Sequence, residues 1–148
     1  METGDASNDK ATRRTSGVGP TGRTIAANVA RIRKARGLTV IGLAEALKAA
    51  GHPMPATGIT KIELERRRVT AEDLVALAIV LGVNVSALLL PPTLEGNTEV
   101  VAAGEVTARE AWRWADGLQP LLNADDEKTH LRFQLHARPT GPRSSSTR

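Results

Sequence analysis

The chain has 148 residues, with 20 lysines and arginines against 16 aspartates and glutamates, and a formal net charge of +4. It contains no cysteine, which excludes disulfide bonds, thiolate metal sites and a cysteine nucleophile. It has no apolar run near the roughly 18 residues of a membrane span, and its first residues lack a signal-peptide pattern, so a cytoplasmic protein without membrane contact is predicted.

The two ends of the chain have the composition of disordered segments. Residues 1–22 and 138–148 are almost free of large apolar side chains, so neither can bury enough surface to order itself. Arg13, Arg14 and Arg23 could form an arm that reaches into the minor groove of DNA, as such arms do in other proteins. A solvated tail is the alternative.

Residues 23–92 are predicted to form a compact all-α domain of five short helices. Apolar residues recur at helical spacing in each segment, and glycines or prolines separate the segments. Thr39, Thr70 and Asn84 stand where side chains cap the starts of helices, and Thr70 has Asp73 in the capping-box position. The third of these helices is expected from position 55 to about position 64.

The remainder is predicted to be a linker, residues 93–98, and a small α/β accessory module, residues 99–137. Two short valine-containing stretches suggest an extended pair, and Thr107 with Glu110 forms a capping box that opens a helix. Residues 130–137 alternate apolar and polar side chains as a strand would, yet the acidic residues before them suit a helix start. The expected fold class is therefore mainly α, with the type of this last element left open.

Several separate motifs in the first domain fall in the order of one known family. These motifs are RIRKARGLT (31–39), LAE (43–45), ITKIE (59–63), and the segments 74–83 and 85–89. With them, the chain resembles the lambda-repressor/Cro-like (XRE) helix-turn-helix family over about residues 25–92. The resemblance implies a five-helix domain that places its third helix in the major groove of double-stranded DNA.

The helix at 55–64 has the pattern that reading of bases requires. Ile59 and Ile62 can anchor its inner face, which leaves small and polar residues on the outer face. Threonine can hydrogen-bond a base edge or place its methyl group against thymine, and lysine can reach guanine. The residues expected to read bases are Ala56, Thr57, Thr60 and Lys61.

Phosphate contacts are expected beside this helix. Residues 21–92 hold ten basic and five acidic residues, whereas residues 93–148 hold seven and eight, so the excess positive charge lies in the first domain. By the resemblance, Arg66, Arg67 and Arg68 stand in the loop beside the DNA backbone, and Thr39 caps a helix whose N-terminus can bind a phosphate. The alternative for the arginines is a solvated loop.

The resemblance also implies a structural ion pair and shows two departures. Arg33 and Glu63 match the family's arginine and glutamate that orient the first and third helices. Where the family usually has a glutamine after the second-helix cap, this chain has Val40 and Ile41. The stretch 48–55 is also longer than the family's usual turn, so an extra helical turn or a bulged loop is expected there.

No constellation in the sequence supports an enzyme. The GVGPTG stretch at 17–22 fits a nucleotide-binding spacing, but no strand precedes it and no βαβ pattern follows it. His52, His130 and His136 lack the spacing and neighbours of a metal site. We therefore expect no catalytic residues, no cofactor and no metal.

These observations predict a sequence-specific, double-stranded DNA-binding transcriptional regulator, similar to bacterial or phage repressors and associated with the nucleoid. Residues 99–137 would serve self-association as a homodimer, contact with the first domain, extra contact with DNA, or contact with a partner protein. The alternative function is an antitoxin-like interaction protein whose C-terminal module binds a partner.

Overall fold

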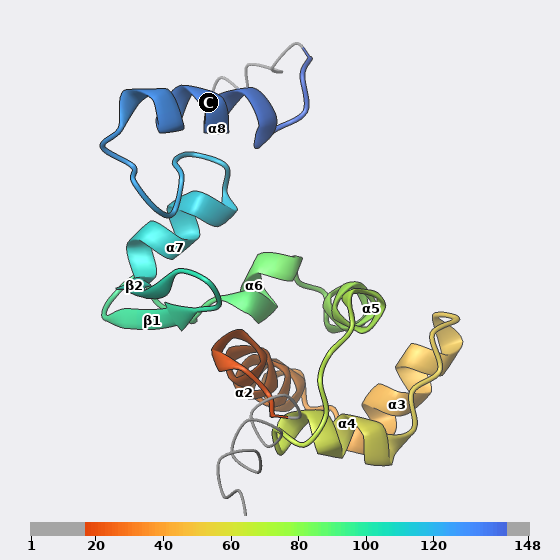
Figure 1. The fold of residues 1–148 in the computed structure, drawn as a ribbon. Coiled ribbons are helices and arrows are strands. Elements are labelled where there is room, and N and C mark those ends of the chain that lie inside the picture. The colour runs from red at the N-terminus through yellow and green to blue at the C-terminus, as the bar shows by residue number, and fades with distance from the viewer. Residues whose placement is uncertain (1–16, 142–148) are drawn as a thin grey trace, which may run out of the picture. The chain divides into compact units, whose positions relative to one another are not determined.

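The protein is described here by a computed structural model that covers residues 17–141. Arg13, Arg14 and most of the two expected tails lie outside the described residues. The chain divides between Pro92 and Thr93 into two compact units (Figure 1). In the described part, no helix is both long and apolar enough to cross a membrane.

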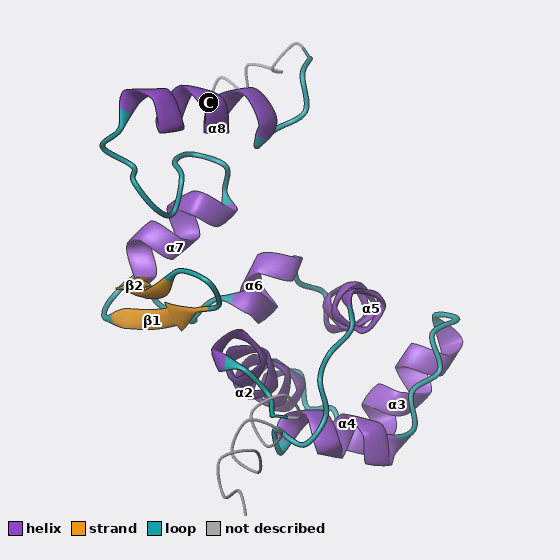
Figure 2. Cartoon of the chain, viewed as in Figure 1, coloured by secondary structure: helices purple, strands orange, loops and turns teal. Residues whose placement is uncertain are grey.

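The described part of the first unit, residues 17–92, is a bundle of five helices (Figures 1 and 2). Thr39 and Asn84 cap two of them through their side chains, and Thr70 forms the expected capping box with Asp73. Helix α2 begins at Pro20, so residues 20–22, expected in the disordered arm, are helical because proline suits a first helical turn. The helices are α2 (Pro20–Ala35), α3 (Val40–Ala49), α4 (Ala56–Glu63), α5 (Ala71–Leu81) and α6 (Val85–Leu89).

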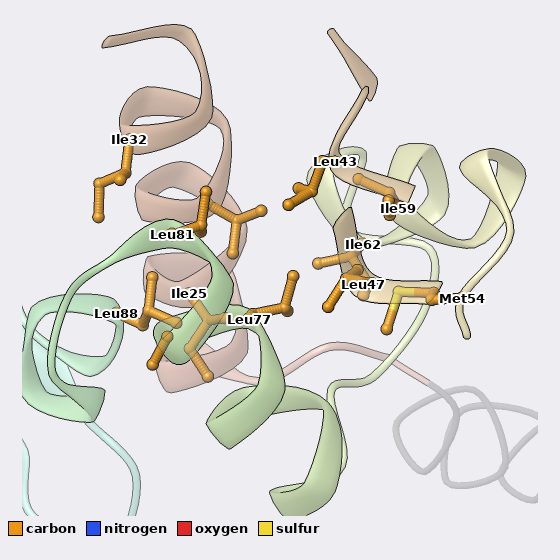
Figure 3. Close-up of a cluster of buried hydrophobic side chains, with 12 residues drawn as sticks. Ile25, Ile32, Leu43, Leu47, Met54, Ile59, Ile62, Leu77, Leu81 and Leu88 are labelled. Carbon is orange, nitrogen blue, oxygen red and sulfur yellow. The ribbon is translucent and has the colours of Figure 1, made fainter. Parts of the chain in front are cut away.

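The core of this unit is a cluster of aliphatic side chains contributed by all five helices (Figure 3). Leu43 and Leu47 of α3 meet Ile59 and Ile62 of α4, and all four are 1% exposed or less. Burial of each such side chain stabilises the fold by about 1.5–3 kcal/mol. Because Ile59 and Ile62 hold one face of α4 in the core, helical periodicity turns the opposite face to solvent.

One buried polar side chain links the first and last helices of the bundle. Asn28 of α2 is 3% exposed, and its Nδ2 donates to the carbonyl oxygens of Leu88 and Leu90 at 3.0 and 2.8 Å. These carbonyls lie at the end of α6, where helical partners run out. The amide therefore satisfies groups that the short helix leaves unpaired.

In the second unit, residues 93–141 form a hairpin and two helices. Strands β1 (Asn97–Val100) and β2 (Gly104–Thr107) are antiparallel, and the expected capping box opens α7 (Ala108–Ala115). The undecided segment is a helix, α8 (Glu127–His136), which Asp126 caps by accepting from the Thr129 amide at 2.8 Å. The mainly α fold class, with its small α/β module, is thus confirmed.

Candidate nucleic-acid interface

The outer face of α4 carries the four residues expected to read bases. Thr57, Thr60 and Lys61 are exposed and Ala56 is half-buried. Together with the start of α3 they line a shallow surface groove of about 420 Å³. The groove is lined by Val40, Ile41, Ala56, Thr57, Thr60, Lys61, Leu64 and Arg66.

The side chains of the three consecutive arginines lie in three different environments. Arg66 is exposed and lines the groove beside α4. Arg67 instead donates through Nη2 to Asp73 Oδ2 at 3.2 Å, and Arg68 donates through Nε and Nη2 to the carbonyl oxygen of Gly17 at 3.3 and 3.2 Å. Of the three, Arg66 is the one that lines the groove together with the expected base readers.

Arg67 crosses close to the first turn of α4, and a glycine makes this approach possible. A Cβ atom built on Gly58 would lie 2.7 Å from Arg67 Nη1 and 3.3 Å from Met54 Cγ. Since real Cβ atoms do not tolerate 2.7 Å, an alanine at this position would force the flexible end of the Arg67 side chain to shift. Gly58 therefore contributes to the placement of Arg67, which sequence reasoning did not foresee.

Thr39 lies at the N-terminus of α3, next to the groove. Its Oγ1 accepts a hydrogen bond from the Gly42 amide at 2.9 Å, which fixes the start of the helix. The residue is exposed, and the two residues that follow it, Val40 and Ile41, line the groove. The positive end of the α3 dipole thus lies at the groove that the outer face of α4 also lines.

Arg33 and Glu63 form a bidentate ion pair that joins α2 to α4. Arg33 Nε lies 2.6 Å from Glu63 Oε1 and Nη2 lies 3.1 Å from Oε2, while Nη1 donates to the carbonyl oxygen of Leu38 at 2.8 Å. The two side chains are only 10% and 13% exposed. The hydrogen bond with Glu63 raises the pKa of the Arg33 guanidinium against the opposing effect of burial. The pair fixes the C-terminal end of α4 relative to α2.

A second polar cluster holds the loop after α3 against the start of α5. Asp73 is buried, and its carboxylate lies 2.9 Å from His52 Nε2 and 3.2 Å from Arg67 Nη2. It also accepts from the Thr70 amide at 3.3 Å as part of the capping box. Burial alone would raise the pKa of Asp73, but hydrogen bonds from His52 and Thr70 and the charge of Arg67 lower it overall.

This cluster predicts an acid-dependent loss of stability. Because the pKa of Asp73 is lowered in the folded state, its stabilisation is complete above its ordinary value of 3.8 and is lost as the pH falls through the folded pKa. We expect Asp73→Asn to destabilise the protein by about 1–3 kcal/mol at neutral pH. The difference from wild type should shrink below about pH 4.

The measurement is urea unfolding of both proteins as a function of pH. Glu72→Gln is the matched control, because Glu72 is exposed in the same helical turn. A wild-type advantage over Asp73→Asn that stays constant down to pH 2 would contradict the assignment.

The other candidates are placed as follows. Arg23 lies in α2, where its Nη1 donates to the carbonyl oxygen of Val18 at 3.3 Å, so it belongs to a helix and not to an extended arm. In the described residues, no group of three or more histidine, aspartate or glutamate side chains is placed to hold a metal ion.

Comparison with known proteins gives a match over part of the chain. A helix-turn-helix family model matches residues 29–88, which include the Arg33–Glu63 pair and every residue of the groove. The match agrees with the expected resemblance to the lambda-repressor/Cro-like (XRE) helix-turn-helix family. This helix-turn-helix domain is a DNA-binding module of the kind found in transcription regulation.

One solved structure with partial similarity is a hypothetical transcription factor, NHTF, from Neisseria. The two sequences are 25% identical, and the match covers 49% of this chain and 77% of the Neisseria chain, with a TM-score of 0.44. No curated protein matched the chain.

Proposed function

We propose that the protein is a sequence-specific regulator of transcription, similar to bacterial and phage repressors, that reads the major groove of double-stranded DNA with α4. The observation that carries the proposal is the groove beside α4. It combines the exposed Thr57, Thr60 and Lys61 with Arg66 in a matched helix-turn-helix domain. These side chains offer hydrogen-bond donors and acceptors to base edges and a positive charge to the backbone.

In this proposal, one set of residues contacts the base edges and another set contacts the phosphates. Thr57 and Lys61 lie one helical turn apart on the exposed face of α4, so both can reach base edges in the same groove. Arg66, which also lines the groove, can bind a phosphate of the DNA backbone. The N-terminus of α3, which Thr39 caps, can bind another. Arg67 contacts Asp73, so any contact of Arg67 with phosphate would compete with an internal ion pair.

The proposal predicts that duplex binding resides in the first unit and depends on salt. Residues 21–92 carry ten basic and five acidic residues, whereas the second unit has more acidic than basic residues. Each phosphate contact should contribute about −0.9 to the slope of log K against log salt. The measurement is selection of bound fragments from a random duplex pool, followed by salt titrations of the full chain and of a 93–148 fragment on the selected duplex. Equal affinity of the two would refute the assignment.

The second unit is proposed to serve contact with a second copy of the chain or with another protein. No residue of α8 is buried, and Leu131 and Leu135, one turn apart, are 54% and 70% exposed. Such a pair favours a protein contact over a merely solvated helix. Co-purification of a stable partner with the full chain would point to the antitoxin-like alternative, and a dimer at micromolar concentration would point to self-association.

A further inference from the structure

The groove beside α4 is lined by both polar and exposed aliphatic side chains. Val40 and Ile41 contribute to it from α3, and Ala56 and Leu64 contribute from α4 or just after it. Ile41 is 64% exposed and Leu64 is 54% exposed. Aliphatic side chains at a DNA-facing surface cannot form hydrogen bonds with base edges, so their contribution to recognition has to be an apolar contact.

The positive charges of the groove indicate which kind of molecule contacts its aliphatic side chains. Lys61 and Arg66 belong to the same lining, and the N-terminus of α3 is directed at the same surface. A purely apolar peptide would leave these positive groups without partners, whereas duplex DNA supplies phosphates to both flanks. On the floor of the major groove, one apolar group protrudes among the hydrogen-bonding edges, namely the C5-methyl group of thymine.

We propose that this groove takes thymine C5-methyl groups, so that Val40 and Ile41 of α3 take part in sequence reading together with α4. The inference rests on the proposed function and deepens it. Threonine methyl groups of Thr57 and Thr60 extend the same apolar lining, while their hydroxyl groups remain available to neighbouring base edges. The preferred site should therefore contain thymine at one or more positions beneath α3 and α4.

The direct test removes the methyl group and leaves the Watson–Crick edge unchanged. Each thymine of the selected duplex is replaced singly by deoxyuridine, and the Kd of the full-length chain is measured for each duplex. At positions beneath the groove we expect a loss of about four-fold in affinity per methyl group, the value for burial of a group of this size. Replacement of thymines that do not lie beneath the groove should leave the Kd unchanged.

A pair of isoleucine variants assigns the effect to this groove. Ile41→Ser removes the apolar contact, and Ile79→Ser is the matched control because Ile79 is 69% exposed on α5 and does not line the groove. At the thymine that Ile41 contacts, Ile41→Ser should bind the thymine and deoxyuridine duplexes equally, whereas thymines contacted by the other apolar residues of the lining should keep their difference. Ile79→Ser should keep the full wild-type difference, and thermal unfolding of both variants checks that they are folded.

Two outcomes would overturn the inference while leaving the proposed function intact. The first is a selected duplex on which no thymine is sensitive to deoxyuridine, although Lys61→Ala still weakens binding to it. The second is an Ile41→Ser variant that retains the wild-type sensitivity at every position. Failure of the wild-type chain to bind any duplex would overturn both proposals.

Discussion

Glu63→Ala should lower the free energy of unfolding by about 3 kcal/mol, at the lower end of the range for loss of one partner of a buried ion pair. The change leaves the Arg33 guanidinium, whose side chain is 10% exposed, hydrogen-bonded to the Leu38 carbonyl oxygen but without its carboxylate partner. Arg33→Ala should have a similar effect, because it leaves the Glu63 carboxylate without its bidentate donor. Urea unfolding of each full-length variant measures the effect.

The double variant is the informative one. Replacing both residues removes both charges, so we expect it to be no less stable than either single variant, which gives a large coupling energy. Lys34→Ala and Glu45→Ala are the matched controls, since they remove the same kinds of charge from exposed positions of α2 and α3. Full additivity of Arg33→Ala and Glu63→Ala would show that the contact does not act as a pair.

The consequence reaches DNA binding because the pair joins α2 to the end of the reading helix. The single variants should weaken binding to the selected duplex even under conditions where they remain folded, since α4 would no longer be held at a fixed angle to α2. Because the whole of α4 would be displaced, the loss of affinity should not depend on any single base pair of the duplex.

The helical bundle was predictable from the sequence because its signals are local. The cap at Thr39, the capping box of Thr70 with Asp73, and the spacing of Ile59 and Ile62 all act within a few residues, and the structure has each of them. The family resemblance was confirmed over 29–88. Local signals conflicted at one place and left the element open: the alternation of apolar and polar residues in 130–137 resembles a strand, whereas the acidic residues before it suit a helix start, and the structure has helix α8 with Asp126 as its cap.

The details of the candidate interface were not predictable because they depend on contacts between distant segments. The sequence shows three adjacent arginines, yet only the fold reveals that Arg67 meets Asp73 and that His52 from the preceding loop shares that carboxylate. Similarly, Val40 and Ile41 were visible as a departure from the family pattern. These two residues line one groove with α4 because α3 packs against α4. The spacing of residues along the sequence does not reveal this packing.

Lys61→Ala or Thr57→Ala should cost about 1–3 kcal/mol of binding free energy on the selected duplex and leave binding to a scrambled duplex almost unchanged. Both side chains are exposed on the outer face of α4, where they can reach base edges, and base contacts discriminate between sequences. Arg66→Ala should instead weaken binding to both duplexes and reduce the salt slope by about one unit, as loss of a phosphate contact does.

Salt titrations of each full-length variant on the selected and scrambled duplexes separate these two roles. Lys128→Ala is the matched control, because it removes an exposed lysine from the second unit. Arg66 is a better probe of phosphate contact than Arg67, whose loss would also break the ion pair with Asp73 and so confound binding with stability. A uniform loss from Lys61→Ala on both duplexes would make Lys61 a phosphate contact. If Thr57→Ala also lost nothing on the selected duplex, α4 would not be the reading helix, and the sequence preference would have to come from another element.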